Sequence, residues 1–231
     1  MRAFIRFLMI PAMLALAVPA SAGDASAFST LFSPAPAARH ATLGVRVYGM
    51  FDFTTLAAKQ SYTAVLGSSH VKAFGGGADV VDVWKHVFVR VAVSHATEDG
   101  SRVFVDNGQI FSLHIPITIA WTPVEVGGGW RFRPGYSATS SITPYVGGAF
   151  VALGYKETSQ FAQAGDNVST YLTGVEGFGG VEFGLLKWLS VAGEAQYRTV
   201  PNALGSAGVT KDFNEKDAGG FTARVLVAFR R

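Results

Sequence analysis

The 231-residue chain contains no cysteine, which excludes disulfide bonds and a lipid-modified N-terminal cysteine. Only 15% of its residues are charged, 49% are hydrophobic, and the mean hydropathy is +0.28. After the N-terminus, no apolar run reaches the roughly 18 residues that a membrane-spanning helix needs. A chain that is this apolar but has no spanning helix indicates either a membrane β-barrel or an unusually apolar soluble β-protein. Its 27 glycines and 18 phenylalanines also favour strands and tight turns.

Residues 1–22 have the pattern of a cleaved secretory signal peptide. Two arginines precede an apolar core at 7–18, and small residues at 20–22 form a cleavage pattern. A single anchoring helix is the alternative, but the core is short and prolines interrupt the segment. Removing both arginines lowers the formal net charge from +3 to +1. The mature chain therefore has no basic excess that would indicate nucleic acid binding.

The remaining chain divides into a short lead-in and one domain. Residues 23–42 are small, proline-containing and aperiodic, as expected of a periplasmic lead-in. Residues 43–231 contain no linker, and apolar and polar residues alternate along them with a period of two. In "HVFVRVAVS", for example, four valines alternate with Phe88, Arg90 and Ala92. About eight such segments occur, each near the 9–11 residues of a tilted membrane strand.

The connections between these segments alternate in length. Short turns are expected within 81–86 and 187–189, with a longer connection at 124–141 on the same side. The other side carries connections at 57–73, 95–108, 156–170 and 199–220, the second with hairpin signals at Asp99-Gly100 and Asn107-Gly108. Long loops on one rim are typical of outer-membrane barrels. The sequence therefore predicts an all-β fold, a transmembrane antiparallel up-and-down β-barrel of about eight strands after a cleaved signal peptide.

Aromatic residues on the apolar parity are expected to form two girdles at the bilayer interfaces, because amphipathic rings favour headgroup depth. The predicted girdle residues are Phe53, Phe111, Tyr155, Tyr171, Tyr197 and Phe221 at the long-loop rim, and Trp84, Trp121, Trp188 and Phe229 at the short-turn rim. A soluble sandwich or lipocalin-like barrel would show no such banding.

Charged residues on the opposite parity should point into the barrel. They are Arg46, Asp52, Asp79, Arg90, Glu176, Glu182, Glu194, Arg198 and Arg224. Nearly balanced buried charges indicate a mutually paired network. Since side chains can fill an eight-stranded barrel, we expect a polar plug rather than a conduction path.

Several segments resemble a known family, among them "IFSLHIPITIAWTPVE", "YKETSQFAQAGDN", "GEAQYRTVPNALG" and the closing "GGFTARVLVAF". They look like the uncharacterised bacterial outer-membrane β-barrel domain proteins, similar in plan to the small OmpA/OmpX/OmpW-type barrels. The resemblance covers about residues 43–229 and implies localisation in the bacterial outer membrane. It also implies contact with outer-membrane lipid and lipopolysaccharide, and with the barrel-assembly machinery and periplasmic chaperones during biogenesis. Phe229 is followed by two arginines, which departs from the terminal aromatic that is typical of such barrels.

The leading functional interpretation is a monomeric, non-enzymatic outer-membrane barrel with a structural role or with recognition through extracellular loops. A narrow pore for small solutes is one alternative. A membrane-embedded lipid A hydrolase or acyltransferase is another, and Ser94, His95 and Glu98 supply its residue types. Ser94 and His95 should however point to opposite faces of a strand. The histidines lack metal-ligand spacing and the glycine-rich stretches lack a following helix, so no catalytic residue, metal or cofactor is expected.

Overall fold

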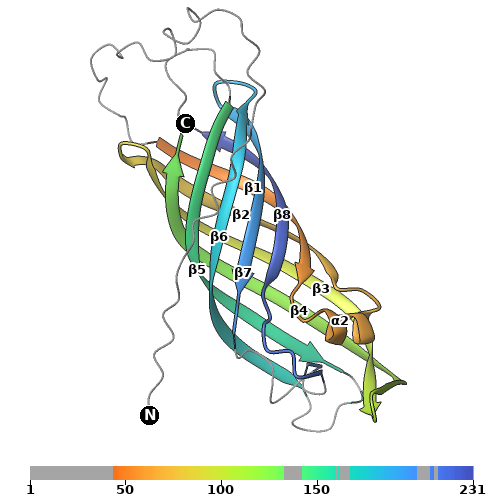
Figure 1. The fold of residues 1–231 in the computed structure, drawn as a ribbon. Coiled ribbons are helices and arrows are strands. Elements are labelled where there is room, and N and C mark those ends of the chain that lie inside the picture. The colour runs from red at the N-terminus through yellow and green to blue at the C-terminus, as the bar shows by residue number, and fades with distance from the viewer. Residues whose placement is uncertain are drawn as a thin grey trace, which may run out of the picture. The chain divides into compact units, whose positions relative to one another are not determined.

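The computed structural model describes residues 44–132, 142–159, 161, 167–201, 209–210 and 213–230. The predicted signal peptide and lead-in lie outside the described residues. The described part forms eight antiparallel strands that close into a barrel, with one short helix, α2, after the first strand (Figure 1). This confirms the predicted up-and-down barrel.

The elements follow one another in chain order around the barrel. They are β1 (Gly44–Leu56), α2 (Lys59–Leu66), β2 (His70–Trp84), β3 (Val87–Asp106), β4 (Gln109–Arg131), β5 (Ile142–Thr158), β6 (Val168–Gly184), β7 (Leu189–Thr199) and β8 (Gly220–Arg230). Each strand pairs with the next, and β8 pairs with β1. Closure leaves no free edge along these ladders, as a bilayer demands because it offers no water to unpaired backbone groups. Among the described residues, no helix is long and apolar enough to cross a membrane.

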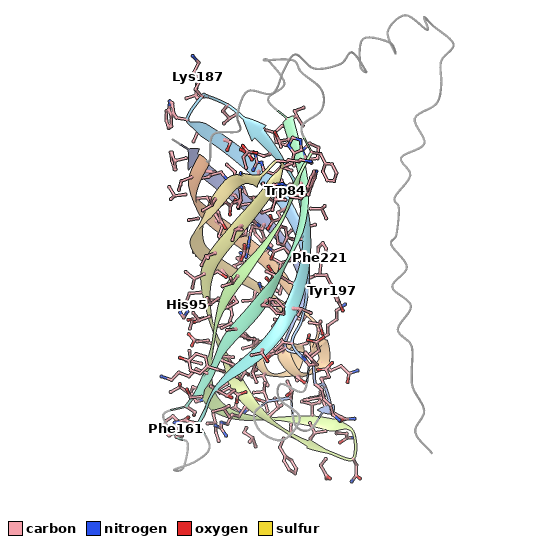
Figure 2. The ribbon with its side chains drawn as sticks, turned by 90° about the vertical axis from the view of Figure 1, so that its left-hand side faces the viewer. Trp84, His95, Phe161, Lys187, Tyr197 and Phe221 are labelled. Atoms are coloured by element: carbon pink, nitrogen blue, oxygen red, sulfur yellow. The ribbon has the colours of Figure 1, made fainter. Side chains whose placement is uncertain are left out.

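The barrel has two different ends. The turn rim carries the start of β1, the end of β8, and the connections after β2, β4 and β6. The loop rim carries α2 and the connections after β3, β5 and β7. In Figure 2 the turn rim is at the top, near Lys187, and the loop rim is at the bottom, near Phe161. The predicted short turns therefore share one rim with the connection after β4.

Side chains alternate between the lumen and the outer surface. Along β8, Arg224 is 1% exposed whereas its neighbour Val225 is 47% exposed. The same alternation places Val89 and Val91 outside, with Arg90 between them inside. In water so many exposed valines would be unfavourable. Around a barrel in lipid, this outer apolar surface is what the solvent requires.

Strands β3 and β4 are longer than the sequence indicated. Residues 95–106, predicted as part of a connection, continue β3, and Val124–Arg131 belongs to β4 rather than to the connection after it. The turn between the strands is Asn107-Gly108, with φ of 50° and 79°. Positive φ at both positions is the signature of a type I′ hairpin turn. The second hairpin signal, Asp99-Gly100, lies inside β3.

Helix α2 fills the lumen at the loop rim. Its Tyr62 is fully buried and packs with Val65 against inward-facing residues of β4 and β5, including Ile119, Trp121 and Tyr155. Gly100 of β3 lets the helix come this close. A Cβ at that position would lie 2.4 Å from the carbonyl oxygen of Val65. This apolar cluster, which we call the helix plug, occupies the barrel interior at the loop rim.

The helix plug overturns two predicted girdle positions. Trp121 is 5% exposed and Tyr155 is 1% exposed, so both point inward rather than toward lipid. The physical reason is that β4 and β5 have apolar residues on the face that covers α2, and this face looks like a lipid-facing one in sequence. Phe111 is exposed, but it pairs with Phe104 in the hairpin beyond the β4–β5 ladder, which starts at Thr118. It therefore lies outside a girdle.

The other predicted girdle residues are on the outer surface: Phe53, Tyr171, Tyr197, Phe221, Trp84, Trp188 and Phe229. At the turn rim, Trp188 stacks on Phe229 with ring centroids 5.9 Å apart, and the Lys85 ammonium lies 5.1 Å from the ring of Trp84. Figure 2 shows Trp84 nearer the turn rim than Tyr197. An aromatic band near each end of the apolar surface is the arrangement of a membrane barrel.

Candidate functional site

The lumen contains a chain of ion pairs contributed by seven of the eight strands. All nine charged residues predicted from the sequence lie there, and the structure adds Glu125 and Arg131 of β4. Both additions fall in 124–141, a segment that the sequence predicts to be a connection. The alternation of Val124, Glu125 and Val126 is the signal that could have identified Glu125.

The chain of ion pairs begins near the turn rim. Arg131 donates to Glu182 at 2.5 Å, and Glu182 also accepts a hydrogen bond from Arg46. Arg46 pairs in turn with Asp79, its neighbour in the β1–β2 ladder. The other oxygen of Asp79 accepts from Arg90 Nε at 3.1 Å. Glu182 and Asp79 thus each bridge two arginines.

The same alternation of charge continues toward the loop rim. Arg90 Nη1 donates to Glu194 at 2.6 Å, and Glu194 lies 3.7 Å from Arg224. Arg224 makes two hydrogen bonds to Asp52, at 2.7 and 2.9 Å, and two to Glu125, both at 2.8 Å. Four arginines and five carboxylates are therefore linked from Arg131 to Glu125.

Arg198 is the last arginine of the network on the side of the loop rim. Its Nη2 donates to Glu125 at 2.5 Å and to Glu176 at 2.8 Å. Apart from Arg198, which is partly exposed, every member of the network is at most 5% exposed. Breaking one partner of such a buried pair typically costs about 3–5 kcal/mol, because the other charge is left uncompensated.

Aromatic rings surround the centre of the network. The Arg90 guanidinium carbon lies 4.6 Å from the ring centroid of Phe178, and within 6 Å of those of Tyr48, Phe88 and Tyr145. A cation over a ring face is attracted by the ring quadrupole, and more strongly where water is excluded. These rings fill the space beside the ion pairs, so the lumen is packed by side chains at this level.

A small cavity of about 40 Å³ separates the ion-pair network from the helix plug. Asp52, Arg198 and Ser94 line it on the polar side, and Trp121 and Leu153 line it on the apolar side. A buried water needs roughly 10–15 Å³, so the cavity has room for a few waters.

The first turn of α2 is held by a carboxylate from the connection between β7 and β8. Glu215, between β7 and β8, accepts hydrogen bonds from the backbone of Gln60 and Ser61 and from the Ser61 hydroxyl, at 3.2, 2.9 and 2.6 Å. These are amides of the first turn of α2, which has no capping side chain of its own. Burial in the plug raises the pKa of the Tyr62 phenol above its ordinary value.

Two further carboxylates order the same rim. Asp217 accepts hydrogen bonds from the backbone amides of Val200 and Gly219, both at 2.8 Å, and from the Thr199 hydroxyl. Glu157 accepts from Tyr155 and from the backbone of Val209. The described connections at the loop rim are therefore tied to the barrel wall by specific contacts.

The residues suggested for an enzyme do not come together. Ser94 points into the lumen and is 2% exposed, whereas His95 lies on the outer surface, where its ring contacts the hydroxyls of Thr97 and Thr122. The barrel wall thus separates a candidate nucleophile from its candidate base. Among the described residues, no group of histidines and carboxylates is arranged to hold a metal ion.

Comparison with known proteins gives likeness at the level of fold. No protein-family model matches the chain, and no curated protein resembles it in sequence. The outer membrane protein OprG of Pseudomonas aeruginosa is similar with a TM-score of 0.54 at 11% identity, over 82% of this chain and 96% of that one. The attachment invasion locus protein Ail of Yersinia pestis gives 0.48 at 10% identity, over 82% and 99%. The chain therefore has the fold of the small outer-membrane β-barrels, as its eight closed strands indicate.

Proposed function

We propose that this protein is a non-enzymatic integral protein of the bacterial outer membrane, with a structural role or with recognition at the loop rim. The observation that carries the proposal is the double closure of the lumen. The ion-pair network fills the barrel between Arg131 and Arg198, and the helix plug covers the network on the side of the loop rim. A barrel closed in this way offers its surroundings its outer surface and its rims.

Several observations favour this function over a pore. A solute would have to part at least one arginine from its carboxylates and to displace α2 with its buried Tyr62. Each broken pair costs about 3–5 kcal/mol, so spontaneous opening would be rare. The separation of Ser94 from His95 speaks against the hydrolase alternative.

The outer surface is suited to lipid, and the loop rim is suited to a partner. The exposed valines and phenylalanines of the strands would contact lipid chains, with lipopolysaccharide as the outer-leaflet component. At the loop rim, Glu157, Glu215 and Asp217 fix the backbone of two connections, the one between β1 and β2 and the one between β7 and β8. A preorganised rim loses less conformational entropy when it binds a partner.

Two measurements test the proposal. In planar lipid bilayers, the purified protein should give no steady porin-sized current steps, while a porin in the same bilayer does. On intact cells, a membrane-impermeant maleimide should label Lys216→Cys at the loop rim and leave Lys85→Cys at the turn rim unlabelled. Both lysines are exposed, and the chain has no other cysteine. Steady current steps, or labelling of Lys85→Cys alone, would overturn the closed lumen or the orientation respectively.

A further inference from the structure

The hairpin between β3 and β4 extends beyond the barrel as a two-stranded ribbon. The β2–β3 ladder ends at Phe74 and His95, and the β4–β5 ladder starts at Thr118 and Thr158. Between these limits and the turn at Asn107-Gly108, the two strands pair only with each other among the described residues. A register shift between Ser101 and Val103 bends the ribbon at its base, as bulges do. Figure 2 shows the ribbon leaving the bottom of the barrel sideways.

The ribbon exposes large apolar side chains although it lies outside the barrel ladders. Phe104, Ile110, Phe111 and Leu113 are each about half exposed, at 55%, 52%, 48% and 47%. The segment Val103–Val105 contains no proline or lysine, which are the residues that usually protect a strand edge. An apolar edge strand with open backbone groups is a template for pairing with another strand.

The turn fixes which backbone groups point to the open edge of β3. A two-residue type I′ turn closes on a hydrogen-bonded pair, here Asp106 and Gln109. Alternation along the ladder then makes Phe104–Phe111 the next hydrogen-bonded pair. The amide and carbonyl groups of Val103 and Val105 therefore point away from β4, toward the open edge.

We propose that this edge pairs with the same edge of a second copy of the protein, antiparallel and about a two-fold axis at Phe104. This register brings Val103 opposite Val105 of the partner subunit, and the reverse, so that four outward-pointing groups on each chain can form hydrogen bonds. Phe104 then lies opposite its own counterpart in a non-hydrogen-bonded pair, where side chains come closest. The contact is isologous and closes after two subunits.

Charge selects this register over its neighbours. With the axis at Phe104, Arg102 lies opposite Asp106 of the partner subunit, and Asp106 lies opposite the partner's Arg102. Opposite charges across an antiparallel pair are stabilising, and like charges are destabilising. An axis at Val103 or Val105 would keep the backbone pattern but lose both charge pairs. When two copies of the sequence Arg-Val-Phe-Val-Asp pair antiparallel, each arginine therefore faces an aspartate.

The inference deepens the proposed function and rests on it, because it names a partner for the loop rim. It also differs from the monomer expected from the sequence, which stays a prediction. An extended peptide of another protein could pair with the same edge. Such a peptide need not carry charges complementary to Arg102 and Asp106, whereas a second copy always does. The symmetry of the charges favours a second copy.

Single cysteines test the two-fold axis directly, since the native chain has none. Phe104→Cys should form a disulfide-linked dimer on mild oxidation of the purified protein in lipid vesicles. Phe111→Cys is the matched control, because it is the opposite residue on the adjacent strand with similar exposure. Its counterpart would lie about three strand spacings away, roughly 14 Å. That exceeds the Cα separation of roughly 7 Å above which a disulfide does not form.

The outcomes separate the alternatives. Dimer from Phe104→Cys but not from Phe111→Cys supports the proposal. Equal yields would show random collision, dimer from Phe111→Cys alone would show contact through β4, and no dimer in a folded barrel would indicate a different partner. Each of these three results overturns the proposal. Gel mobility before and after heating shows whether each variant is folded, and bilayer conductance of the same sample tests the proposed function independently.

A charge reversal adds a test of register. Asp106→Arg in the Phe104→Cys background places like charges opposite each other twice, so the dimer yield should fall about tenfold. Adding Arg102→Asp should restore it, because the exchanged pairs are again opposite in sign. A yield unaffected by Asp106→Arg would contradict the proposed register.

Discussion

Arg224 and Asp52 form a two-pronged ion pair across the seam at which the barrel closes. The two residues are direct partners in the β1–β8 register, and both guanidinium contacts are shorter than 3 Å. Their strands lie at opposite ends of the sequence of the barrel. A charge that would be unfavourable in an apolar closing strand is thus satisfied by the first strand of the same sheet.

Replacing Arg224 with methionine should destabilise the barrel by about 3–5 kcal/mol, because it leaves Asp52 and Glu125 without their shared cation. The measurement is urea unfolding of the protein refolded into lipid vesicles. Adding Asp52→Asn should recover part of the loss, since it neutralises one of the two carboxylates that have lost Arg224 as a partner. A neutral effect of Arg224→Met would contradict the paired network.

The neighbouring position provides a matched comparison. Val225 lies on the outer surface, so Val225→Arg should cost about 2–4 kcal/mol near the bilayer midplane. The cause is transfer of a charge into lipid, so no substitution in the lumen should rescue it. Rescue by Asp52→Asn or by a similar lumen change would show that the two faces are assigned wrongly.

Gly100→Val should expel α2 from the lumen. The new side chain would collide with the backbone of Val65, which cannot move without shifting the helix. In vesicles, trypsin should then cleave after Lys59 much faster than in the native protein. Gly49→Val is the control, because a Cβ at Gly49 meets nothing within 4 Å. Equal cleavage rates in both variants would show that the helix does not depend on this contact.

Glu215→Ala should loosen the first turn of α2. The variant removes the acceptor for the amides of Gln60 and Ser61, and hydrogen bonds to charged groups contribute about 1.5–3 kcal/mol. Amide hydrogen exchange at Ser61 should therefore be at least about tenfold faster than in the native protein. Lys216→Ala serves as control, since this neighbour is exposed. Unchanged exchange in Glu215→Ala would show that the α2 terminus is held by other contacts.

Much of the fold was predictable because lipid imposes a simple rule on each strand. The alternation around Arg90 and Arg224 required apolar residues outside and polar residues inside, and the structure follows it. Nine members of the ion-pair network came from this parity alone. Their pairing partners did not, because register depends on how the strands align around the closed sheet.

Two of the misplaced girdle residues share one physical cause. Trp121 and Tyr155 are aromatic and lie on regularly alternating strands, so the sequence pattern predicts that they face lipid. In the structure they cover α2, whose presence in the lumen has no simple signal in the sequence. The end of β4, with Arg131, has a different cause: the glycines at 127–129 interrupt the alternation that would indicate a strand.

The central claim is that the apolar face of each strand meets lipid while the charged face meets the lumen. The most direct test is a nitroxide scan of β8 by single cysteines in lipid vesicles, one residue at a time from Phe221 to Phe229. Collision with oxygen, which concentrates in the bilayer, should be high at odd positions and low at even ones, because Val225 and Val227 are exposed whereas Arg224 and Leu226 are buried. Maxima at the even positions, or no period of two, would contradict the account.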